Sequence, residues 1–241
     1  MNTLPLFYKK VVPLNKTRHQ DLRVSPLKDY SHTRDTNSLY IAAVEFLNAA
    51  REYPIVFGKG NDGAVFPLLL LGLKNKENLY VGKKGEWLAS YIPAYVRRYP
   101  FILATDNKNS GNFTVCIDES YPGFSHKKTG TRLFNEDGSE SPLLKQSVEF
   151  LKGYQTHVQL TTKFCNTINE LNLLEPMQAN LEKSGKKQRV TGFMCVNRKR
   201  LNGLTTEQLT TLFRDEHLEL IYAHLHSLLN MEVLLRRPAP V

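Results

Sequence analysis

Short runs of apolar residues, separated by polar turns, dominate the first half of the chain. These runs are rich in β-branched and aromatic residues, and the turns contain Gly, Pro, Asn and Asp, a pattern typical of strands. We expect strands at residues 4–14, 19–24, 55–57, 65–73, 79–81, 86–88, 99–103 and 113–117. The sequence Asn61-Asp62-Gly63 is a turn signal that predicts a hairpin between two of these strands.

Two short helical patterns interrupt the strands. Apolar residues at helical spacing predict a helix that begins at Asn37 or Ser38 and continues to about residue 52, where Pro54 stops it. A second short helix is expected over residues 90–98.

The second half of the chain has a helical pattern. Ser141 followed by a proline is typical of a helix start, and apolar residues recur at helical spacing over residues 144–171. Thr205 and Gln208 form a capping box, which indicates the start of another helix. We also expect a strand at 190–196 and helices at 206–213 and 216–229.

Strands and helices are therefore segregated along the chain. Strands dominate residues 1–118, helices dominate residues 141–241, and residues 119–140 form a connection rich in glycine and charge. This segregation predicts an α+β fold, with a mixed or antiparallel β-rich N-terminal half containing two short helices, and a helical C-terminal half. A chain of 241 residues with 41% hydrophobic residues can fold as one composite domain.

The chain is basic, with 32 Lys and Arg against 23 Asp and Glu and a net charge of +9. This charge favours acidic partners, including nucleic acid. The basic residues are scattered in pairs, and no nucleic-acid-binding motif is present. Nucleic-acid binding therefore stays a further hypothesis, and it predicts an affinity that falls steeply with salt.

The cysteines and the apolar runs bear on the compartment. Cys116, Cys165 and Cys195 form no CxxC pair, which favours buried, reduced thiols. The order of charge and apolar residues at the N-terminus is wrong for a signal peptide. The longest apolar run, at 64–73, has ten residues, whereas a membrane span needs about 20. We expect a soluble cytoplasmic protein that can associate with the cell envelope.

A series of short phrases, many with an aromatic residue beside a proline, runs through the chain in order. They are RHQDLR at 18–23, EF at 45–46, YPIVF at 53–57, LGL at 71–73, ENLY at 77–80, WLASYIP at 87–93, RRYPF at 97–101, GTRLFNEDG at 130–138, TTKF at 161–164, GFMCV at 192–196 and IYAHLHS at 221–227. In these phrases the chain resembles the SapC family over nearly its whole length.

The resemblance implies a bacterial protein. The family takes its name from a surface-layer gene cluster, and many members look like accessory proteins encoded near outer-membrane receptors and flavin-dependent halogenase-like enzymes. The resemblance thus implies an accessory protein of bacterial envelope or surface-layer systems. Our first hypothesis is a binding protein that acts through contacts with a protein partner, and we predict no cofactor. The resemblance brings no catalytic residues to this chain.

A metal-dependent enzyme is the alternative hypothesis. His19 and Asp21 are two residues apart, so on a strand both side chains would point the same way and could hold one Fe(II) ion. His126 or His157 could supply the third ligand of an oxygenase or another modifying enzyme. Such oxygenases need an unbroken double-stranded β-barrel, however, and two helices interrupt this chain.

A second group of residues is a candidate contact for an anion or a partner. Arg97 and Arg98, followed by Tyr99, could hold a phosphate or carboxylate through bidentate hydrogen bonds. At the end of a helix, arginines also offset the helix dipole, which is the structural alternative. Trp87 is the other aromatic residue that we assign to this contact.

The last long helix carries a cluster of histidines. His217 and His224 share a face, His226 points elsewhere, and the neighbouring face is apolar, so we expect flanking or surface histidines. No HExxH motif is present, and phosphate-binding loops and nucleophile elbows are absent as well. We therefore expect a protein that is not an enzyme, and no residue is designated as catalytic.

Overall fold

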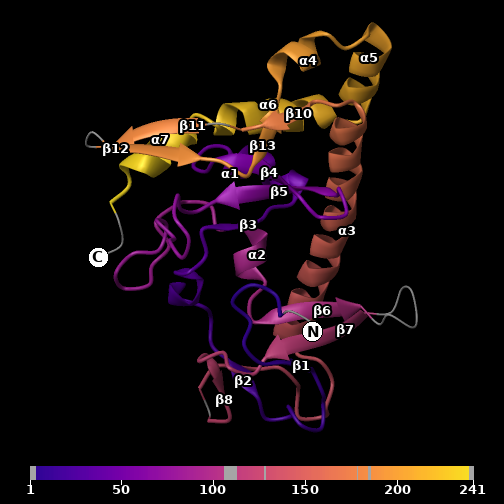
Figure 1. The fold of residues 1–241 in the computed structure, drawn as a ribbon. Coiled ribbons are helices and arrows are strands. Elements are labelled where there is room, and N and C mark those ends of the chain that lie inside the picture. The colour runs from indigo at the N-terminus through magenta and orange to yellow at the C-terminus, as the bar shows by residue number, and fades with distance from the viewer. Residues whose placement is uncertain (1–3, 106–112, 128, 178, 184–185, 239–241) are drawn as a thin grey trace.

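The computed structural model describes residues 4–105, 113–127, 129–177, 179–183 and 186–238. Figure 1 shows the larger sheet, a two-stranded hairpin and the C-terminal helices at one end of the molecule, and two smaller sheets at the other end. The long helix α3 (Pro142–Glu170) runs along one side and reaches both ends.

The larger sheet has five antiparallel strands in the order β10-β13-β4-β5-β3. Their bounds are β10 Leu174–Pro176, β13 Met194–Val196, β4 Ile55–Lys59, β5 Val65–Leu70 and β3 Ser38–Tyr40. Leu39, Ile55, Phe57 and Leu69 are fully buried and contribute to the larger hydrophobic core. Because β13 pairs with β4, strands from both halves of the chain belong to one sheet.

The hairpin between β4 and β5 forms at the turn that the sequence predicts. Gly63 has a φ of +81°, a left-handed conformation that glycine adopts without steric cost. The Ala64 amide donates to the Asp62 carboxylate at 3.0 Å, and the Gly63 amide donates to the Gly60 carbonyl at 3.0 Å. These bonds set the register in which Phe57 lies opposite Pro67.

Three smaller sheets contain the other strands of the described residues. One sheet has the order β1-β7-β6, a second has β8-β2-β9, and β11 with β12 forms a hairpin, all antiparallel. Their bounds are β1 Val11–Pro13, β2 Arg23–Val24, β6 Phe101–Thr105, β7 Phe113–Asp118, β8 Phe124–Ser125, β9 Thr131–Arg132, β11 Ala179–Lys183 and β12 Lys186–Val190.

Helix α3 connects the two hydrophobic cores. It begins at the predicted cap, where the Leu144 amide donates to the Ser141 hydroxyl at 3.3 Å. Leu144 and Leu151, near its start, belong to the smaller core beside the β1-β7-β6 sheet, whereas Phe164 and Ile168 belong to the larger core. The helix therefore packs against both ends of the molecule.

The remaining helices are short. Their bounds are η1 Ser31–Thr33, η2 Ala43–Glu45, α1 Phe46–Ala49, α2 Ala94–Arg97, α4 Arg198–Asn202, α5 Thr206–Arg214, α6 His217–Ser227 and α7 Asn230–Arg236. The capping box of Thr205 and Gln208 is present at the start of α5, as the sequence predicts.

The prediction of one helix from residue 38 to 52 is wrong. Residues 38–40 form β3, at the edge of the sheet beside β5, and helical structure begins only at Ala43. Pairing with β5 provides backbone hydrogen bonds and buries Leu39 fully, and Ile41 after the strand is fully buried too. This tertiary gain outweighs the local helical preference.

The predicted α+β class is confirmed, with sheets mainly from the N-terminal half and helices mainly from the C-terminal half. Within the part of the chain that the structure describes, no helix has both the length and the apolar character to cross a membrane. The divisions at 1–118, 119–140 and 141–241 stay predictions.

Candidate functional site

The structure places the candidate metal ligands His19 and Asp21 in a turn and not on a strand, so that prediction for residues 19–22 is wrong. The Asn15 side chain causes this, because its Oδ1 accepts the Thr17 and Arg18 amides and starts a turn over residues 16–21. His19 is buried. The Asp21 side chain is 72% exposed and lies 3.7 Å from Arg132.

His19 and His126 do line one pocket, of about 380 Å³. Glu119 lies there too, with its carboxylate 2.9 Å from Lys10, 2.5 Å from Arg18 and 3.4 Å from His19 Nε2. The hydrogen bond from Lys10 is the main cause that lowers the pKa of Glu119.

The other ring nitrogen of His19, Nδ1, accepts the Asn15 amide at 2.9 Å. Among the described residues, no three His, Cys, Asp or Glu side chains are grouped so that they could hold a metal ion. An iron site with His19, Asp21 and His126 stays a prediction.

The predicted anion contact is divided between three places. Arg97 and Arg98 line one pocket, of about 250 Å³, beside α3. Tyr99 is buried, and its ring stacks on His32 with centroids 4.5 Å apart. The Trp87 indole donates to the Tyr53 hydroxyl at 2.7 Å. The two arginines are thus the members of this group that share a pocket.

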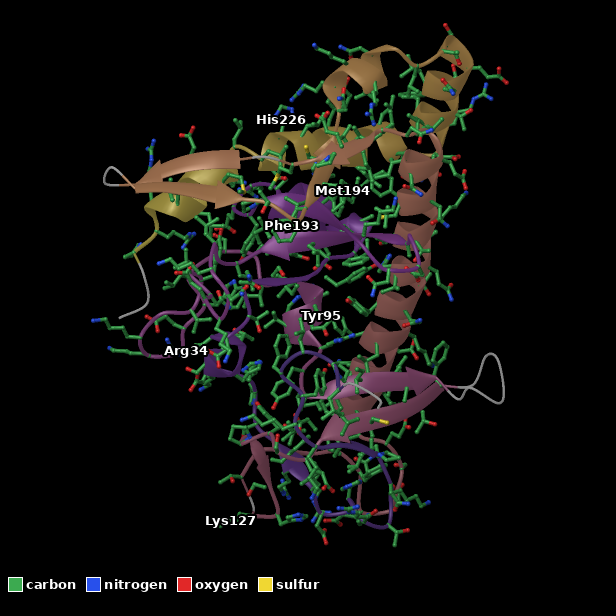
Figure 2. The ribbon with its side chains drawn as sticks, viewed as in Figure 1. Arg34, Tyr95, Lys127, Phe193, Met194 and His226 are labelled. Carbon is green, nitrogen blue, oxygen red and sulfur yellow. The ribbon has the colours of Figure 1, made fainter. Side chains whose placement is uncertain are left out.

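The histidines of α6 differ in their surroundings. His224 is fully buried, and its Nε2 accepts the Val196 amide at 3.0 Å while Nδ1 lies 2.8 Å from the Ile55 carbonyl oxygen. Burial lowers the pKa of His224 to about 4, so the ring is neutral at pH 7. His226 is exposed, and Figure 2 shows it on α6. His217, at the start of α6, lines a groove.

Several solvent-exposed apolar side chains line this groove, which has a volume of about 390 Å³. It lies where η2 and α1, the middle of α3, and the turn between α5 and α6 meet. Val44, Leu47 and Leu160 line it and are 57%, 51% and 56% exposed. The other lining residues are Ala43, His157, Lys163, Phe164, Asp215, Glu216, His217, Glu219 and Leu220. We call this site the α3–α6 groove. Apolar side chains gathered in a groove are typical of a binding site.

Two imidazoles in the α3–α6 groove have unused hydrogen-bonding capacity. The Nδ1 atoms of His157 and His217 are buried and have no hydrogen-bond partner among the described residues. His217 is only 6% exposed, and its ring meets Phe164 edge-on with centroids 5.2 Å apart. Burial lowers the pKa of His217, which favours the neutral ring. Each Nδ1 could therefore donate or accept one hydrogen bond, depending on the tautomer of the ring, with a polar group of a bound ligand.

The turn between α5 and α6 brings His217 to this position. Glu216 has a φ of +60°, a left-handed conformation that is unusual for a residue other than glycine. Such backbone strain occurs where the surrounding structure holds a residue in place. Here it turns the chain sharply, so that Asp215, Glu216 and His217 all line the groove.

The rim of the α3–α6 groove is acidic, although the whole chain is basic. Asp215, Glu216 and Glu219 are exposed and line the groove, together with a single ammonium group, on Lys163. None of these three carboxylates forms an ion pair with another described residue. The acids that form ion pairs in the described part of the chain are different ones, such as Glu119 and Asp21. The rim therefore favours a cationic ligand.

No pattern that we identified in the sequence predicts this groove. Leu47 lies within residues 38–52, where apolar spacing predicts a helix, but the structure exposes its side chain. The available signal is Leu160, an apolar residue that lies outside the helical stripe of α3 containing Leu151, Tyr154 and Cys165.

The comparison with protein families gives a match over most of the chain. The family model described as SapC matches residues 14–234 of 241, which confirms the resemblance found in the sequence. No curated protein and no solved structure matches the chain.

Proposed function

This chain belongs to the SapC family, and we propose that it is a binding protein that holds an apolar, positively charged segment of a partner protein in the α3–α6 groove. The observation that carries the proposal is the combination, at one site, of exposed leucines with carboxylates that have no ion-pair partner among the described residues. The partner that the family resemblance implies is a component of the bacterial envelope or of a surface-layer system, and this is part of the proposal.

The apolar lining would provide the affinity. Covering a half-exposed Val44, Leu47 or Leu160 contributes about 1 kcal/mol each from burial of apolar surface. His157 and His217 can add hydrogen bonds to the backbone or to a polar side chain of the segment. Because association itself costs several kcal/mol, we expect moderate affinity from this site alone.

The acidic rim would provide the selectivity. Lysine or arginine side chains beside the apolar residues of the partner would meet Asp215, Glu216 and Glu219, which have no cationic partner among the described residues. An acidic segment would be repelled. Charge complementarity of this kind mainly selects partners and speeds association.

The test uses two synthetic helical peptides, one with leucines on one face and lysines on the other, and one with leucines and glutamates. We expect the leucine–lysine peptide to bind the parent protein more tightly than the leucine–glutamate peptide. Replacement of Leu47 and Leu160 together by serine should weaken that binding at least tenfold.

The matched control is Phe213→Ser, since Phe213 is 73% exposed on α5 but does not line the groove. It should leave peptide binding unchanged. Equal binding by the parent, the double variant and the control would contradict the proposal. So would a dimer of the parent that the double variant abolishes, because a second copy of the chain would then occupy the groove.

A further inference from the structure

The pocket of about 250 Å³ that Arg97 and Arg98 line lies between the end of α2 and the first turns of α3. Its charged and polar lining comes from Arg97, Arg98, Gln146 and Ser147. Its apolar lining is formed by Phe101, Leu143, Phe150 and Leu151. It involves an earlier stretch of α3 than the α3–α6 groove, so the two sites can be altered separately.

Arg98 is surrounded by tyrosine rings. Its guanidinium carbon lies 3.9 Å from the ring centroid of Tyr95, 5.2 Å from that of Tyr154 and 5.9 Å from that of Tyr8. Figure 2 shows Tyr95 on α2, between the two ends of the molecule. Aromatic faces stabilise the guanidinium cation and hold its position, but they accept hydrogen bonds from few of its five N–H donors.

The donors of Arg98 are not used elsewhere in the described structure. The side chain is half-buried, its Nε is buried without an acceptor, and no carboxylate or carbonyl of the described residues receives a hydrogen bond from it. A buried donor without a partner is costly to the folded state. A ligand that accepts from this guanidinium would remove that cost.

Arg97 brings a second positive charge to the same pocket. Its Nε donates to the Ile92 carbonyl at 2.9 Å, which orients the guanidinium, and its guanidinium carbon lies 5.1 Å from the ring centroid of Phe150. The buried acid Glu45 is not among the residues that line the pocket, and its oxygens already accept from the amides of Ala42 and Ala94 and from the Tyr91 hydroxyl. Among the residues that the structure describes, no carboxylate lines the pocket itself.

We propose that this pocket binds a small organic carboxylate, with its two oxygens on Arg97 and Arg98 and its apolar body on Phe101, Leu143 and Leu151. Two guanidinium groups match the two oxygens of a carboxylate. A phosphate has more oxygens to satisfy, and Ser147 cannot help, because its hydroxyl donates to the Leu143 carbonyl at 2.9 Å. The apolar floor also favours a carboxylate on a short hydrocarbon chain.

The experiment is calorimetric titration of the parent protein with hexanoate, with its neutral counterpart hexanamide, and with inorganic phosphate. We expect binding of hexanoate, at least tenfold weaker binding of hexanamide, and weaker binding of phosphate than of hexanoate. Absence of hexanoate binding, equal binding of hexanamide, or tighter binding of phosphate would each overturn the proposal.

Variants locate the site. Arg97→Gln, at an exposed position that should not affect folding, is expected to weaken hexanoate binding about tenfold, and Arg98→Gln to abolish it. The control Arg214→Gln removes an exposed arginine at the end of α5 and should leave binding unchanged. An equal loss in all three variants would indicate general charge attraction and contradict a specific pocket.

One further arm identifies the source of the carboxylate. A short apolar peptide with a free C-terminus is compared with the same peptide carrying a C-terminal amide. Tighter binding of the free peptide than of hexanoate would support the pocket and place the carboxylate at a protein terminus. Preference for hexanoate would support the pocket and favour a free small acid. Variants of Leu47 and Leu160 should change neither hexanoate binding nor binding of the free peptide. The carboxylate pocket and the binding function proposed for the α3–α6 groove can therefore be disproved independently.

Discussion

His224 donates a hydrogen bond from Nδ1 to the carbonyl oxygen of Ile55, at 2.8 Å. The direction follows from the opposite ring nitrogen, because Nε2 accepts the Val196 amide at 3.0 Å and the neutral ring has one proton. Ile55 is on β4 and Val196 is on β13, and the register of these two strands includes one residue pair, Met194 opposite Phe57. A side chain from α6 thus bridges the junction that unites the two halves of the chain in one sheet.

Replacement of His224 by leucine should destabilise the protein by about 2–4 kcal/mol, because the Val196 amide and the Ile55 carbonyl lose a buried partner. Urea denaturation measures the change. The control is His226→Leu, at an exposed position on the same helix, which should change stability by less than about 0.5 kcal/mol. Equal stabilities of the two variants would show that the bridge contributes little.

The same bridge predicts how stability depends on pH. The pKa of His224 is about 4 in the folded protein, below its ordinary value of 6.5, so the unfolded chain takes up this proton first as the pH falls. The stabilisation is complete above about pH 6.5 and decreases between pH 6.5 and 4, by about 3 kcal/mol in total. Unfolding curves at several pH values, compared with those of His224→Leu, measure this contribution. If the free energy of unfolding depended on pH in the same way in both proteins, a contribution from His224 would be contradicted.

Replacement of His217 should cost much less stability than replacement of His224. Its Nδ1 is buried without a partner in the described structure, so His217→Leu removes an unsatisfied group and should not lower the free energy of unfolding by more than about 1 kcal/mol. The same variant should weaken binding of the leucine–lysine peptide. A large loss of stability with unchanged peptide binding would assign His217 a purely structural role.

The iron hypothesis has its own test, which is total metal analysis of protein purified without chelator. We expect no stoichiometric iron, because Asp21 is exposed beside Arg132 while His19 is buried against Glu119. About one iron per chain, lost when both His19 and Asp21 are replaced by alanine, would instead support a metal-dependent enzyme and justify an oxidation assay.

The sequence predicts those elements whose local signals agree with their tertiary surroundings. The capped helix at Ser141, the hairpin at Asn61-Asp62-Gly63 and the capping box at Thr205 all carry a pattern within a few residues, and the structure has them. At β3 and around His19 the local pattern is overruled, once by sheet pairing and once by the side chain of Asn15.

The α3–α6 groove could not be predicted in the same way. It brings together Leu47, Leu160 and His217, which are far apart in the chain, and its acidic rim becomes visible only once α5 and α6 are placed. A pattern within one segment shows that Leu47 and Leu160 are apolar. Their exposure depends on how α1, α3 and α6 pack.

The most direct test of the α3–α6 groove is an NMR titration of methyl-labelled protein with the leucine–lysine peptide. We predict that the methyl signals of Val44, Leu47, Leu160 and Leu220, together with the ring signals of His217, shift first and most. Exposed methyl groups elsewhere, such as those of Leu229, should stay unchanged. Shifts spread evenly over the surface, or centred away from the groove, would contradict the proposed binding function.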